Sequence, residues 1–553
     1  MSKNLRGLSA RKDLTTSLFS EIAKVSLSPQ TDKETLLTEV SGKYLVGKSS
    51  VLGTSSFYDF LKSDRAEKKI FICDGTACLT SGKQEKLKEA LLRSFSEEEI
   101  GTVTCLGHCH TNNAFIYDHA TYALSDQDDV DKILKTGISS KAAFYTGTNA
   151  DKPALLEQIS DISEYYGVMK KYTANISAAL REIELSALRG RGGAGFSFHL
   201  KLKTTIGIIS DQKYVVCNAD EGDPGSFSDK WLLEENPHSV LFGMIMTGLI
   251  IGADTGVIYI RGEYPESVRA VKIAVRQLEE ENIIFNNQFK KEFGFKFHIV
   301  EGAGAYVCGE ETSLLNSLEG LRPEVRTRPP FPARYGLFGK PTILANVETF
   351  ANIRYILKEG GLTYSSIGTE KSTGTKLVSL DGAFRKPGVY EVRMGTRLGY
   401  VFNELGGGTK YPVKAFQIGG PLGGIVPAAM ANDLNLDFES VSDAGFLLGH
   451  AGVVSIPVDF PMIKFLLHLF EFTSKESCGK CFPCRIGSVR GYELLKGASE
   501  KGKKIDKDLF SDLLETMQLG SLCALGGGLP LPVKNAMQYF SSELEEYFTL
   551  QNR

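Results

Sequence analysis

Eight of the ten cysteines fall into two groups of four whose spacing is typical of metal-ligating thiols. The C-terminal group has Cys478, Cys481 and Cys484 within seven consecutive residues, and Cys523 follows further along the chain. One tight turn can deliver three thiolates to three irons of a cubane cluster, and a second segment can supply the fourth. Zinc also binds cysteine, but its structural sites usually show two separated pairs. The spacing therefore favours a [4Fe–4S] cluster over zinc.

The second group lies in the N-terminal quarter of the chain. Four residues separate Cys73 from Cys78, and three separate Cys105 from Cys109. Two such pairs at strand ends fit a [2Fe–2S] cluster, which needs four thiolates, and zinc remains the alternative. The first loop, Gly-Thr-Ala-Cys, and the second, Cys-Leu-Gly-His-Cys, resemble those of thioredoxin-like [2Fe–2S] ferredoxins. That resemblance predicts a [2Fe–2S] cluster on these four thiols.

Three loops are suited to a flavin and a dinucleotide. Gly190–Phe196 is rich in glycine, so its backbone N–H groups can approach a phosphate or a flat ring without obstruction by Cβ atoms. Asn218–Gly225 follows a predicted strand and offers an amide and three carboxylates to ribityl or ribose hydroxyls. Tyr306–Thr312 adds the paired carboxylates of Glu310 and Glu311. Together the loops predict a binding site for a flavin and a nucleotide.

Each loop also has an alternative interpretation. Gly190–Phe196 lacks the Rossmann spacing and the Lys-Ser/Thr ending of a P-loop, so its glycines alone also fit a flexible surface loop. The acidic residues of Asn218–Gly225 could coordinate Ca²⁺, although the twelve-residue EF-hand spacing is absent. Paired carboxylates also serve glycosidases as acid and base. A glycosidase would leave the neighbouring cysteines unexplained.

The motifs resemble, in order along the chain, those of the NADH-binding flavoprotein subunit of respiratory complex I and its soluble relatives. Besides the three loops, the resemblance includes Pro329-Pro-Phe-Pro332, Asn346-Val-Glu-Thr349 and the Cys478 motif, and it covers about residues 150–540. It implies FMN in a Rossmann-like domain, a ubiquitin-like β-grasp domain and a C-terminal helical bundle with a [4Fe–4S] cluster. Complex I carries its thioredoxin-like domain on a partner subunit. Its fusion here is similar to soluble NAD-linked hydrogenases, formate dehydrogenases and related reductases.

Carried over by position, the resemblance implies two sets of ligand contacts. The residues expected to border FMN are Gly190, Arg191, Gly192, Gly193, Lys201, Asn218, Asp220, Glu221, Tyr306, Gly309, Glu310, Asn346 and Thr349. Phe196 and Phe331 would pack on the NADH rings, and Glu311 would bind the adenosine ribose and disfavour a 2′-phosphate. Glu221 and Asp223 would position the nicotinamide, and no side chain is assigned as an acid or a base.

The chain departs from the family pattern around the nucleotide. Ser-Phe-His-Leu-Lys-Leu follows Phe196 in place of Pro-Thr-Gly-Leu-Lys-Trp, and Thr204 stands where an aromatic residue would enclose adenine. Asp223 replaces a longer Glu, and Ala345 replaces the first Asn of an Asn-Asn pair. These departures concern nicotinamide placement and the choice between NAD and NADP.

The elements that must position these residues follow from hydrophobic periodicity and turn residues. Strands are expected at Tyr214–Cys217, Gly256–Ile260 and Lys296–Glu301, each followed by a loop of Gly, Asp and Glu. The expected fold is a multidomain α/β protein: an N-terminal polar and helical segment (1–65), a thioredoxin-like [2Fe–2S] domain (66–138), a Rossmann-like FMN/NADH domain (140–368), a β-grasp domain (370–455) and a helical bundle with the [4Fe–4S] site (456–553).

Composition excludes several classes of protein. The 553 residues carry a formal net charge of -3, so there is no basic footprint for nucleic acid or an anionic membrane. The longest apolar run, Val240–Ile251, is too short to span a bilayer and predicts a buried helix. No apolar segment of signal-peptide length follows the N-terminus. We therefore expect a cytoplasmic protein with reduced thiols, in which Cys217 and Cys308 are small buried hydrophobes.

These observations predict an NADH:acceptor oxidoreductase, a diaphorase subunit of a soluble complex. FMN would exchange hydride with NAD(H), and electrons would pass singly through the clusters. Expected partners are a small thioredoxin-like [2Fe–2S] subunit and an iron–sulfur or catalytic subunit of a hydrogenase, formate dehydrogenase or similar reductase. The alternatives are a non-catalytic electron-relay or scaffold subunit, a respiratory complex I subunit and a zinc-stabilised binding protein.

Overall fold

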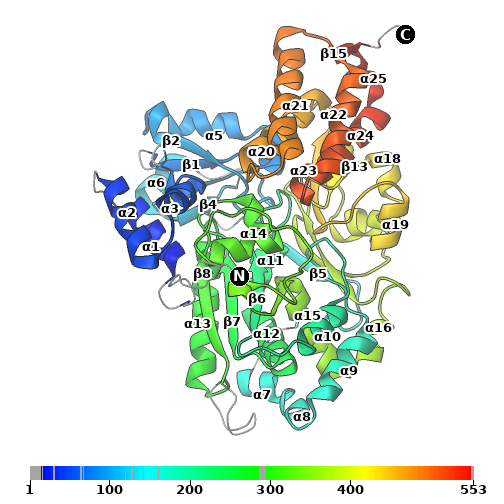
Figure 1. Cartoon of the computed structure of the whole chain (residues 1–553). Coiled ribbons are helices and arrows are strands. Elements are labelled where there is room, and N and C mark those ends of the chain that lie inside the picture. Colours follow the sequence, from blue (N-terminus) through cyan, green and yellow to red (C-terminus); the bar gives the residue numbers. More distant parts are fainter. Residues whose placement is uncertain are drawn as a thin grey trace.

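The computed structural model describes residues 17–28, 32–62, 68–118, 120–125, 129–140, 142–157, 161–284 and 294–549, together with residues 14, 65 and 159. Within these residues the strands form two four-stranded sheets, one six-stranded sheet and one two-stranded pair. The C-terminal helices extend from the rest of the molecule at the top of Figure 1. Predictions for residues 1–13 lie outside the described residues.

The N-terminal segment is helical where it is described. Its helices are α1 (Leu18–Ser26), α2 (Lys33–Tyr44) and α3 (Lys48–Ser55), followed by a 3₁₀ turn at Asp59–Leu61. Apolar residues of these helices share one buried cluster with strand residues Val216 and Val257 of the central parallel sheet. The Tyr58 hydroxyl donates to Ser317 Oγ at 2.7 Å. The segment therefore packs on the sheet expected to carry the flavin loops.

The first four-stranded sheet holds the N-terminal cysteines. Its order is β2-β1-β3-β4, in which β1 and β2 are parallel and β3 and β4 are antiparallel to their neighbours. The elements are β1 (Ile70–Cys73), α4 (Thr76–Ser81), α5 (Gln84–Leu91), β2 (Ile100–Val103), β3 (Ala114–Tyr117), β4 (Ala120–Ala123) and α6 (Val130–Thr136).

The second four-stranded sheet is entirely parallel, in the order β8-β7-β6-β9. Three of its strands are the predicted ones: β6 (Tyr214–Ala219), β7 (Thr255–Ile260) and β8 (Lys296–Glu301). The fourth, β9 (Thr342–Asn346), was not predicted. Helices around this sheet are α7 (Ile162–Gly167), α8 (Lys170–Thr173), α9 (Ile176–Ser186), α10 (Phe198–Ile206), α11 (Ser228–Glu235), α12 (Pro237–Ile251), α13 (Pro265–Glu280), α14 (Glu311–Leu318), α15 (Val347–Glu359) and α16 (Gly361–Ser365).

The predicted buried helix at Val240–Ile251 is confirmed as part of α12. All its residues from His238 onward are buried, because α12 packs against strands β6 and β7 of the parallel sheet and against several helices, α15 above all. A Cβ atom on Gly243 would lie 2.1 Å from the backbone oxygen of Phe350 on α15. The glycine therefore allows the two helix backbones to approach closely.

The six-stranded sheet draws strands from distant parts of the chain. Its order is β13 (Gly424–Pro427), β12 (Val413–Ile418), β14 (Gly452–Pro457), β10 (Thr375–Leu380), β11 (Gly388–Arg393) and β5 (Tyr145–Thr148). The predicted boundary at residue 140 assigns β5 to the flavin domain, but β5 pairs parallel with β11 of this sheet. Local pattern gives no sign of a partner more than 200 residues away. Short helices α17 (Leu398–Tyr400), α18 (Ala428–Ala431) and α19 (Phe438–Asp443) connect these strands.

The C-terminal region is mainly helical. It contains α20 (Met462–Glu476), α21 (Phe482–Lys501), α22 (Lys507–Gly520), α23 (Ala524–Gly528), α24 (Pro530–Tyr539) and α25 (Ser541–Leu544), with a short parallel pair β15 (Ile505–Asp506) and β16 (Phe548–Thr549). The three-cysteine loop joins α20 to α21, and Cys523 lies between α22 and α23. In the part of the chain that the structure describes, no helix combines the length and apolarity needed to cross a bilayer.

Candidate functional site

A cavity of about 410 Å³ lies beyond the carboxyl ends of β6 and β9, a location typical of ligand sites on parallel sheets. It brings together the glycine-rich loop, both acidic loops and the turn before β14. Its lining includes nine of the thirteen residues predicted to border FMN: Gly192, Gly193, Asn218, Asp220, Glu221, Tyr306, Gly309, Glu310 and Asn346. Asp223 also lines it, and so does Cys523 of the C-terminal cysteine group.

Two glycines make one wall of this cavity accessible. A Cβ atom on Gly192 would lie 2.9 Å from Cβ of Asn346, and Gly193 adopts a φ of +113° that side chains strongly disfavour. The loop is held in place by Thr349, whose Oγ1 accepts from the backbone N–H of Arg191 at 2.9 Å. The loop is therefore a fixed, Cβ-free wall, suited to a planar ring or a phosphate.

The acidic loops supply the polar part of the cavity. Asn218 Nδ2 donates to the Gly309 carbonyl at 2.8 Å, and the Tyr306 hydroxyl donates to Asp223 Oδ1 at 2.6 Å. Burial raises the pKa of both Asp220 and Asp223. Asp220 Oδ2 is buried and has no hydrogen-bond partner. A buried acceptor without a donor fits a site whose ligand brings hydroxyl groups.

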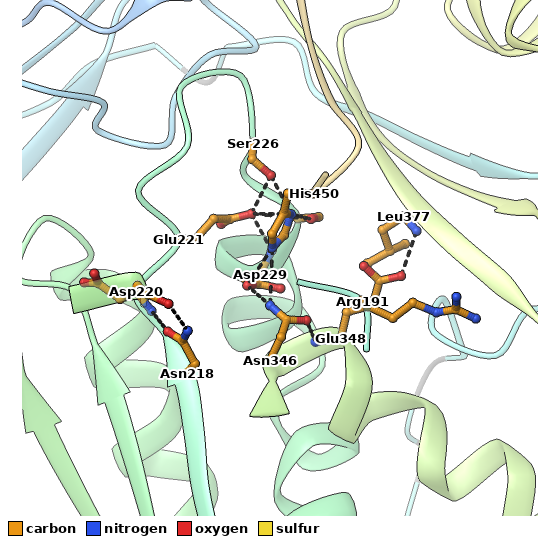
Figure 2. Close-up of polar contacts among 12 residues, drawn as sticks. Arg191, Asn218, Asp220, Glu221, Ser226, Asp229, Asn346, Glu348, Leu377 and His450 are labelled. Carbon is orange, nitrogen blue, oxygen red and sulfur yellow. Dashed lines mark hydrogen bonds and ion pairs between the residues drawn. The ribbon is translucent and has the colours of Figure 1, made fainter. Parts of the chain in front are cut away.

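Glu221 lies deeper than expected for a residue that positions a nicotinamide. Its carboxylate accepts from the backbone N–H groups of Asp229 and Lys230, at 3.0 and 2.9 Å, in the first turn of α11. It also accepts from Ser226 Oγ at 3.0 Å. Figure 2 shows Glu221 in a polar group with Ser226, Asp229 and His450. The carboxylate therefore stabilises the helix N-terminus beside the cavity.

Sequence analysis did not identify Ser226, Asp229 and His450. His450 and Asp229 line the cavity, and His450 Nε2 lies 3.1 Å from Asp229 Oδ2. Asn346 Nδ2 also donates to Asp229 Oδ2, at 2.6 Å. These residues come from a loop, from α11 and from the turn before β14, so no spacing in the sequence connects them. The sequence signal nearest to them is the acidic loop Asn218–Gly225, which ends four residues before Asp229 and indicates that carboxylates gather here.

Four of the residues predicted to border FMN do not line the cavity, namely Gly190, Arg191, Lys201 and Thr349. Arg191 is fully buried, and its guanidinium donates to the Tyr364 hydroxyl at 2.9 Å and the Thr373 carbonyl at 2.5 Å. Figure 2 shows this side chain extending away from the cavity residues. The guanidinium joins α16 to the strand region near β10, and the predicted place of Arg191 beside FMN stays a prediction.

The residues predicted to contact NADH lie on neighbouring exposed loops. Phe196 and Phe331 are 52% and 56% exposed, which is unusual for phenyl rings and fits contact with a ligand. Glu311 forms ion pairs with Arg328 at 2.8 Å and with Lys201 at 3.4 Å. The predicted ribose ligand is therefore flanked by two cations.

The C-terminal cysteines converge beside the cavity. Burial raises the pKa of Cys484 to about 11, with Cys481 and Cys478 adding to the effect. Burial likewise raises the pKa of Cys523 to about 12, and Cys478 and Cys484 contribute. The Tyr306 ring packs edge-on against Phe472 at 4.8 Å, in the same apolar cluster as Cys484 and Cys523. The predicted [4Fe–4S] ligands thus gather beside the cavity, and one of them, Cys523, lines it.

The N-terminal cysteines also converge. The pKa of Cys78 lies well above its usual value. The neighbouring Cys73 thiol and burial are the main causes, and the Cys109 and Cys105 thiols add to them. Sγ atoms of Cys105 and Cys109 are 3.6 Å apart. The backbone N–H of Gly225, in the acidic loop, donates to Cys109 Sγ at 3.3 Å. This thiol group is therefore joined directly to the acidic loop that lines the cavity.

Thiol spacing bears on the zinc alternative for both groups. Tetrahedral zinc, with Zn–S bonds of about 2.3 Å, would hold its thiolates about 3.8 Å apart. Among the described residues, which include all eight cysteines, no three thiols of either group have ligand atoms within 4.8 Å of one another. A cluster distributes its thiolates over several irons, so the wider spacing fits iron–sulfur clusters better than a single zinc ion.

Comparison with known proteins agrees with this arrangement. Three family models match: a thioredoxin-like [2Fe–2S] ferredoxin over residues 31–137, the Nuo51 FMN-binding domain over 183–355 and the NADH-ubiquinone oxidoreductase-F iron–sulfur binding region over 464–547. The NADP-reducing hydrogenase subunit HndC of Solidesulfovibrio fructosivorans is 42% identical over 401 residues, covering 71% of this chain and 81% of that protein. This chain belongs to the family of FMN- and iron–sulfur-binding NADH oxidoreductase subunits.

Two further similarities extend across the fused N-terminal domain. The NAD-reducing hydrogenase HoxS subunit alpha of Cupriavidus necator is 32% identical over 529 residues, covering 88% of this chain and 84% of that protein. A crystal structure of an air-oxidised NAD⁺-reducing [NiFe]-hydrogenase matches with a TM-score of 0.84 at 25% identity, covering 100% of this chain and 96% of that one. The family models name FMN, [2Fe–2S] and [4Fe–4S] groups, as the sequence predicted.

Proposed function

We propose that this chain is the diaphorase subunit of a soluble multisubunit complex, an NADH:acceptor oxidoreductase that exchanges electrons between NAD(H) and iron–sulfur clusters. The observation that carries the proposal is that both cysteine groups adjoin the loops that form the 410 Å³ cavity. Cys523 lines the cavity, and Gly225, at the end of its acidic loop, donates to Cys109. A two-electron cofactor held there would have a one-electron acceptor at each cysteine group.

When bound, FMN supplies the hydride chemistry and can release two electrons one at a time. The chain's own residues bind and orient. Gly192 and Gly193 would face the ring or phosphate, and Asn218 and Asp220 would take the ribityl hydroxyls. Asp223, fixed by the Tyr306 hydroxyl, would face the nicotinamide in place of the deeper Glu221. No described side chain is needed as a general acid or base for this reaction.

Arg261 supports the link between the flavin loop and the [2Fe–2S] loop. Its guanidinium donates to the backbone carbonyl of Glu221 and, at 3.2 Å, to that of Thr104, the residue before Cys105. It also pairs with Glu263, and all three groups are buried. This buried, hydrogen-bonded guanidinium fixes the distance between the two loops. The rate of single-electron transfer depends on the distance between donor and acceptor, so a fixed distance suits it.

The finer assignments follow from the same proposal. The six-stranded sheet corresponds to the expected β-grasp domain and α20–α25 to the expected helical bundle. Partners would be a small [2Fe–2S] subunit and an iron–sulfur or catalytic subunit of a hydrogenase, formate dehydrogenase or similar reductase. The eight cysteines proposed to bind metal form no disulfides, which favours a reducing compartment such as the cytoplasm. The two hydrogenase relatives favour a subunit of a soluble, hydrogenase-like complex over a respiratory complex I subunit.

The proposal is tested on the purified full-length chain loaded with FMN, iron and sulfide. Wild type should show flavin absorbance and NADH-dependent dye reduction, and a relay subunit without catalysis would show neither. Cys481→Ser should abolish the [4Fe–4S] EPR signal and leave FMN bound, whereas Cys78→Ser should abolish only the [2Fe–2S] signal. Cys217→Ala, in the buried strand β6, is the matched control and should keep both signals. An unchanged cluster signal in Cys481→Ser would refute the ligand assignment.

A further inference from the structure

His450 occupies an unusual position for a histidine. It lies in the turn before β14, is almost completely buried and lines the proposed flavin cavity. Its Nδ1 is 2.7 Å from Ser226 Oγ, which donates in turn to Glu221 Oε1, and its Nε2 is 3.1 Å from Asp229 Oδ2. Figure 2 shows the ring between the two carboxylates. Nε2 also lies 3.3 Å from the Asn346 amide nitrogen, which itself donates to Asp229 Oδ2. Each ring nitrogen thus faces an acceptor, the Ser226 hydroxyl at Nδ1 and the Asp229 carboxylate at Nε2.

The two buried carboxylates beside the ring favour a proton on each nitrogen. The side chains of Glu221 and Asp229 are almost inaccessible to solvent, so their negative charges need a nearby cation. A neutral imidazole would leave one nitrogen without a proton to offer its acceptor. The protonated ring satisfies both, with Nδ1–H toward Ser226 and Nε2–H toward Asp229.

A metal ion does not explain the cluster as well. One ligand atom from each of Glu221, Asp229 and His450 lies within 4.8 Å of the others. The imidazole, however, stands between the carboxylates, with Glu221 facing Nδ1 and Asp229 facing Nε2. A metal would need both carboxylates on the same side of one ring nitrogen. The histidine itself occupies the place of the cation.

We propose that His450 is a positively charged residue of the flavin site that stabilises the reduced form of bound FMN. This inference rests on the proposed function. A fixed cation in the wall of a cavity with low dielectric favours added negative charge on the ligand, and no reorganisation is needed when electrons arrive. Asp220 and Asp223 of the acidic loop also line the cavity, and negative charge on either would oppose reduction, so a cation at His450 acts in the opposite direction.

The groups that face His450 determine its charge. Burial lowers the pKa of His450, but Asp229 and Glu221 outweigh burial and raise it to about 9, while Lys376 acts in the lowering direction. Lys376 on β10 is paired with Glu348 on α15, so its own charge is largely balanced. Asp223 also faces the histidine across the cavity. An ordinary histidine has a pKa of about 6.5, so His450 stays charged at neutral pH.

The test is the midpoint potential of FMN in purified, FMN-loaded full-length protein, measured by spectroelectrochemistry. His450→Gln keeps hydrogen-bonding capacity but removes the charge, so the potential should shift to a more negative value. His450→Lys restores a cation and should recover part of the shift. The difference between wild type and His450→Gln should be largest below pH 8 and shrink as pH rises through about 9, where wild type loses its charge. His238→Gln, in α12 outside the cavity, should not shift the potential.

Equal potentials in wild type and His450→Gln, with FMN bound in both, would overturn the proposal. A second measurement covers the case in which His450→Gln fails to fold. Nitrogen-15 NMR of histidine-labelled wild-type apoprotein, with the signal assigned by its loss in His450→Lys, should show both ring nitrogens protonated at pH 7.5. A neutral ring at that pH would also overturn it. If wild type binds no FMN, the proposed function fails, and the NMR result is unaffected.

Discussion

At the scale of single residues, several carboxylates that the motifs assign to ligands also bind the protein itself. Glu310 Oε2 accepts from the backbone N–H groups of Thr312 and Ser313, both at 2.9 Å, and so caps α14. Glu221 does the same for α11. Asp220, with one oxygen lacking a partner, is the carboxylate left available for a ligand. Some carboxylates of the acidic loops therefore cap two helix N-termini, and the other carboxylates are available to the cofactor.

The choice between NADH and NADPH depends on the environment of Glu311. A bare carboxylate at the ribose would repel a 2′-phosphate, but Arg328 and Lys201 both pair with Glu311. Their two charges reduce that repulsion and could themselves attract a phosphate. Thr204 stands where an aromatic residue would enclose adenine, and a threonine has no ring. Its hydroxyl donates to the Leu200 carbonyl at 2.9 Å. Discrimination against NADPH should therefore be weaker than the carboxylate alone implies.

We expect Glu311→Gln to relax this discrimination. The substitution removes one negative charge and frees Arg328 and Lys201, so the preference for NADH over NADPH should fall by about 1–3 kcal/mol, as for the loss of one charge-assisted contact. Steady-state dye reduction with both nucleotides measures the ratio of kcat/KM values. The control is Glu301→Gln, which removes an exposed carboxylate that pairs with Lys272. An unchanged ratio in Glu311→Gln would show that Glu311 is not the selector.

At the scale of elements, the helix pair α12 and α15 positions the site. α15 begins directly after Asn346, whose side chain lines the cavity, and α12 follows α11, which carries Asp229. The pair is in close contact because Gly243 has no side chain where α12 meets Phe350 of α15. Any shift of one helix relative to the other would move Asn346 relative to Asp229. Packing far from the ligand therefore determines the geometry of the cavity.

Gly243→Ala tests this contact. The added methyl would overlap the Phe350 carbonyl, so the helices must separate, which we expect to cost about 1–3 kcal/mol of stability and to weaken FMN binding. Gly53→Ala is the matched control, because Gly53 lies in α3 and its added Cβ would have no atom within 4 Å. That substitution should be neutral or stabilising by about 0.5–1 kcal/mol. Thermal unfolding and FMN fluorescence titration give both results, and equal effects of the two substitutions would contradict the argument.

Sequence patterns predicted the elements whose signals are local. The strands β6 and β7 are mostly apolar runs, β8 mixes polar and apolar residues before a glycine-rich loop, and α12 is an apolar run without a polar face. β9 was missed because its five residues follow a proline-rich loop and have no loop of Gly, Asp and Glu. β5 was assigned to the wrong sheet because strand pairing over 240 residues leaves no local pattern. His450 was missed for the same reason, since its partners Glu221 and Asp229 are more than 220 residues away.

At the scale of the whole molecule, the two cysteine groups both adjoin the loops of the cavity but differ in their access to solvent. The N-terminal group is enclosed, with all four cysteines buried. The C-terminal group lies at the base of the protruding helices α20–α22 (Figure 1), and Cys481 and Cys523 are only partly buried. Electrons that leave the chain therefore have their shortest route to the surface at the C-terminal group.

The surface around this exit carries an exposed apolar patch. Phe482, Ile486 and Val489 lie on one face of α21, at the spacing of helical turns, and Leu519 and Leu522 lie nearby at the end of α22, which packs against α21. Exposed apolar side chains beside cluster ligands fit a docking surface, and we expect its occupant to be the partner subunit that carries the next iron–sulfur cluster. Both hydrogenase relatives are by name subunits of hydrogenases.

Ile486→Glu should disrupt this docking without affecting the cofactors. Ile486 is 56% exposed, so a charged side chain is tolerated in the free subunit but would be buried without a partner charge in the complex. The native complex, purified through a tag on this chain, should lose its iron–sulfur partner, while NADH-dependent dye reduction by the chain itself stays at the wild-type level. Ile273→Glu, equally exposed on α13 and distant in sequence from both cysteine groups, is the control and should retain the partner. Retention of the partner by Ile486→Glu would place the docking surface elsewhere.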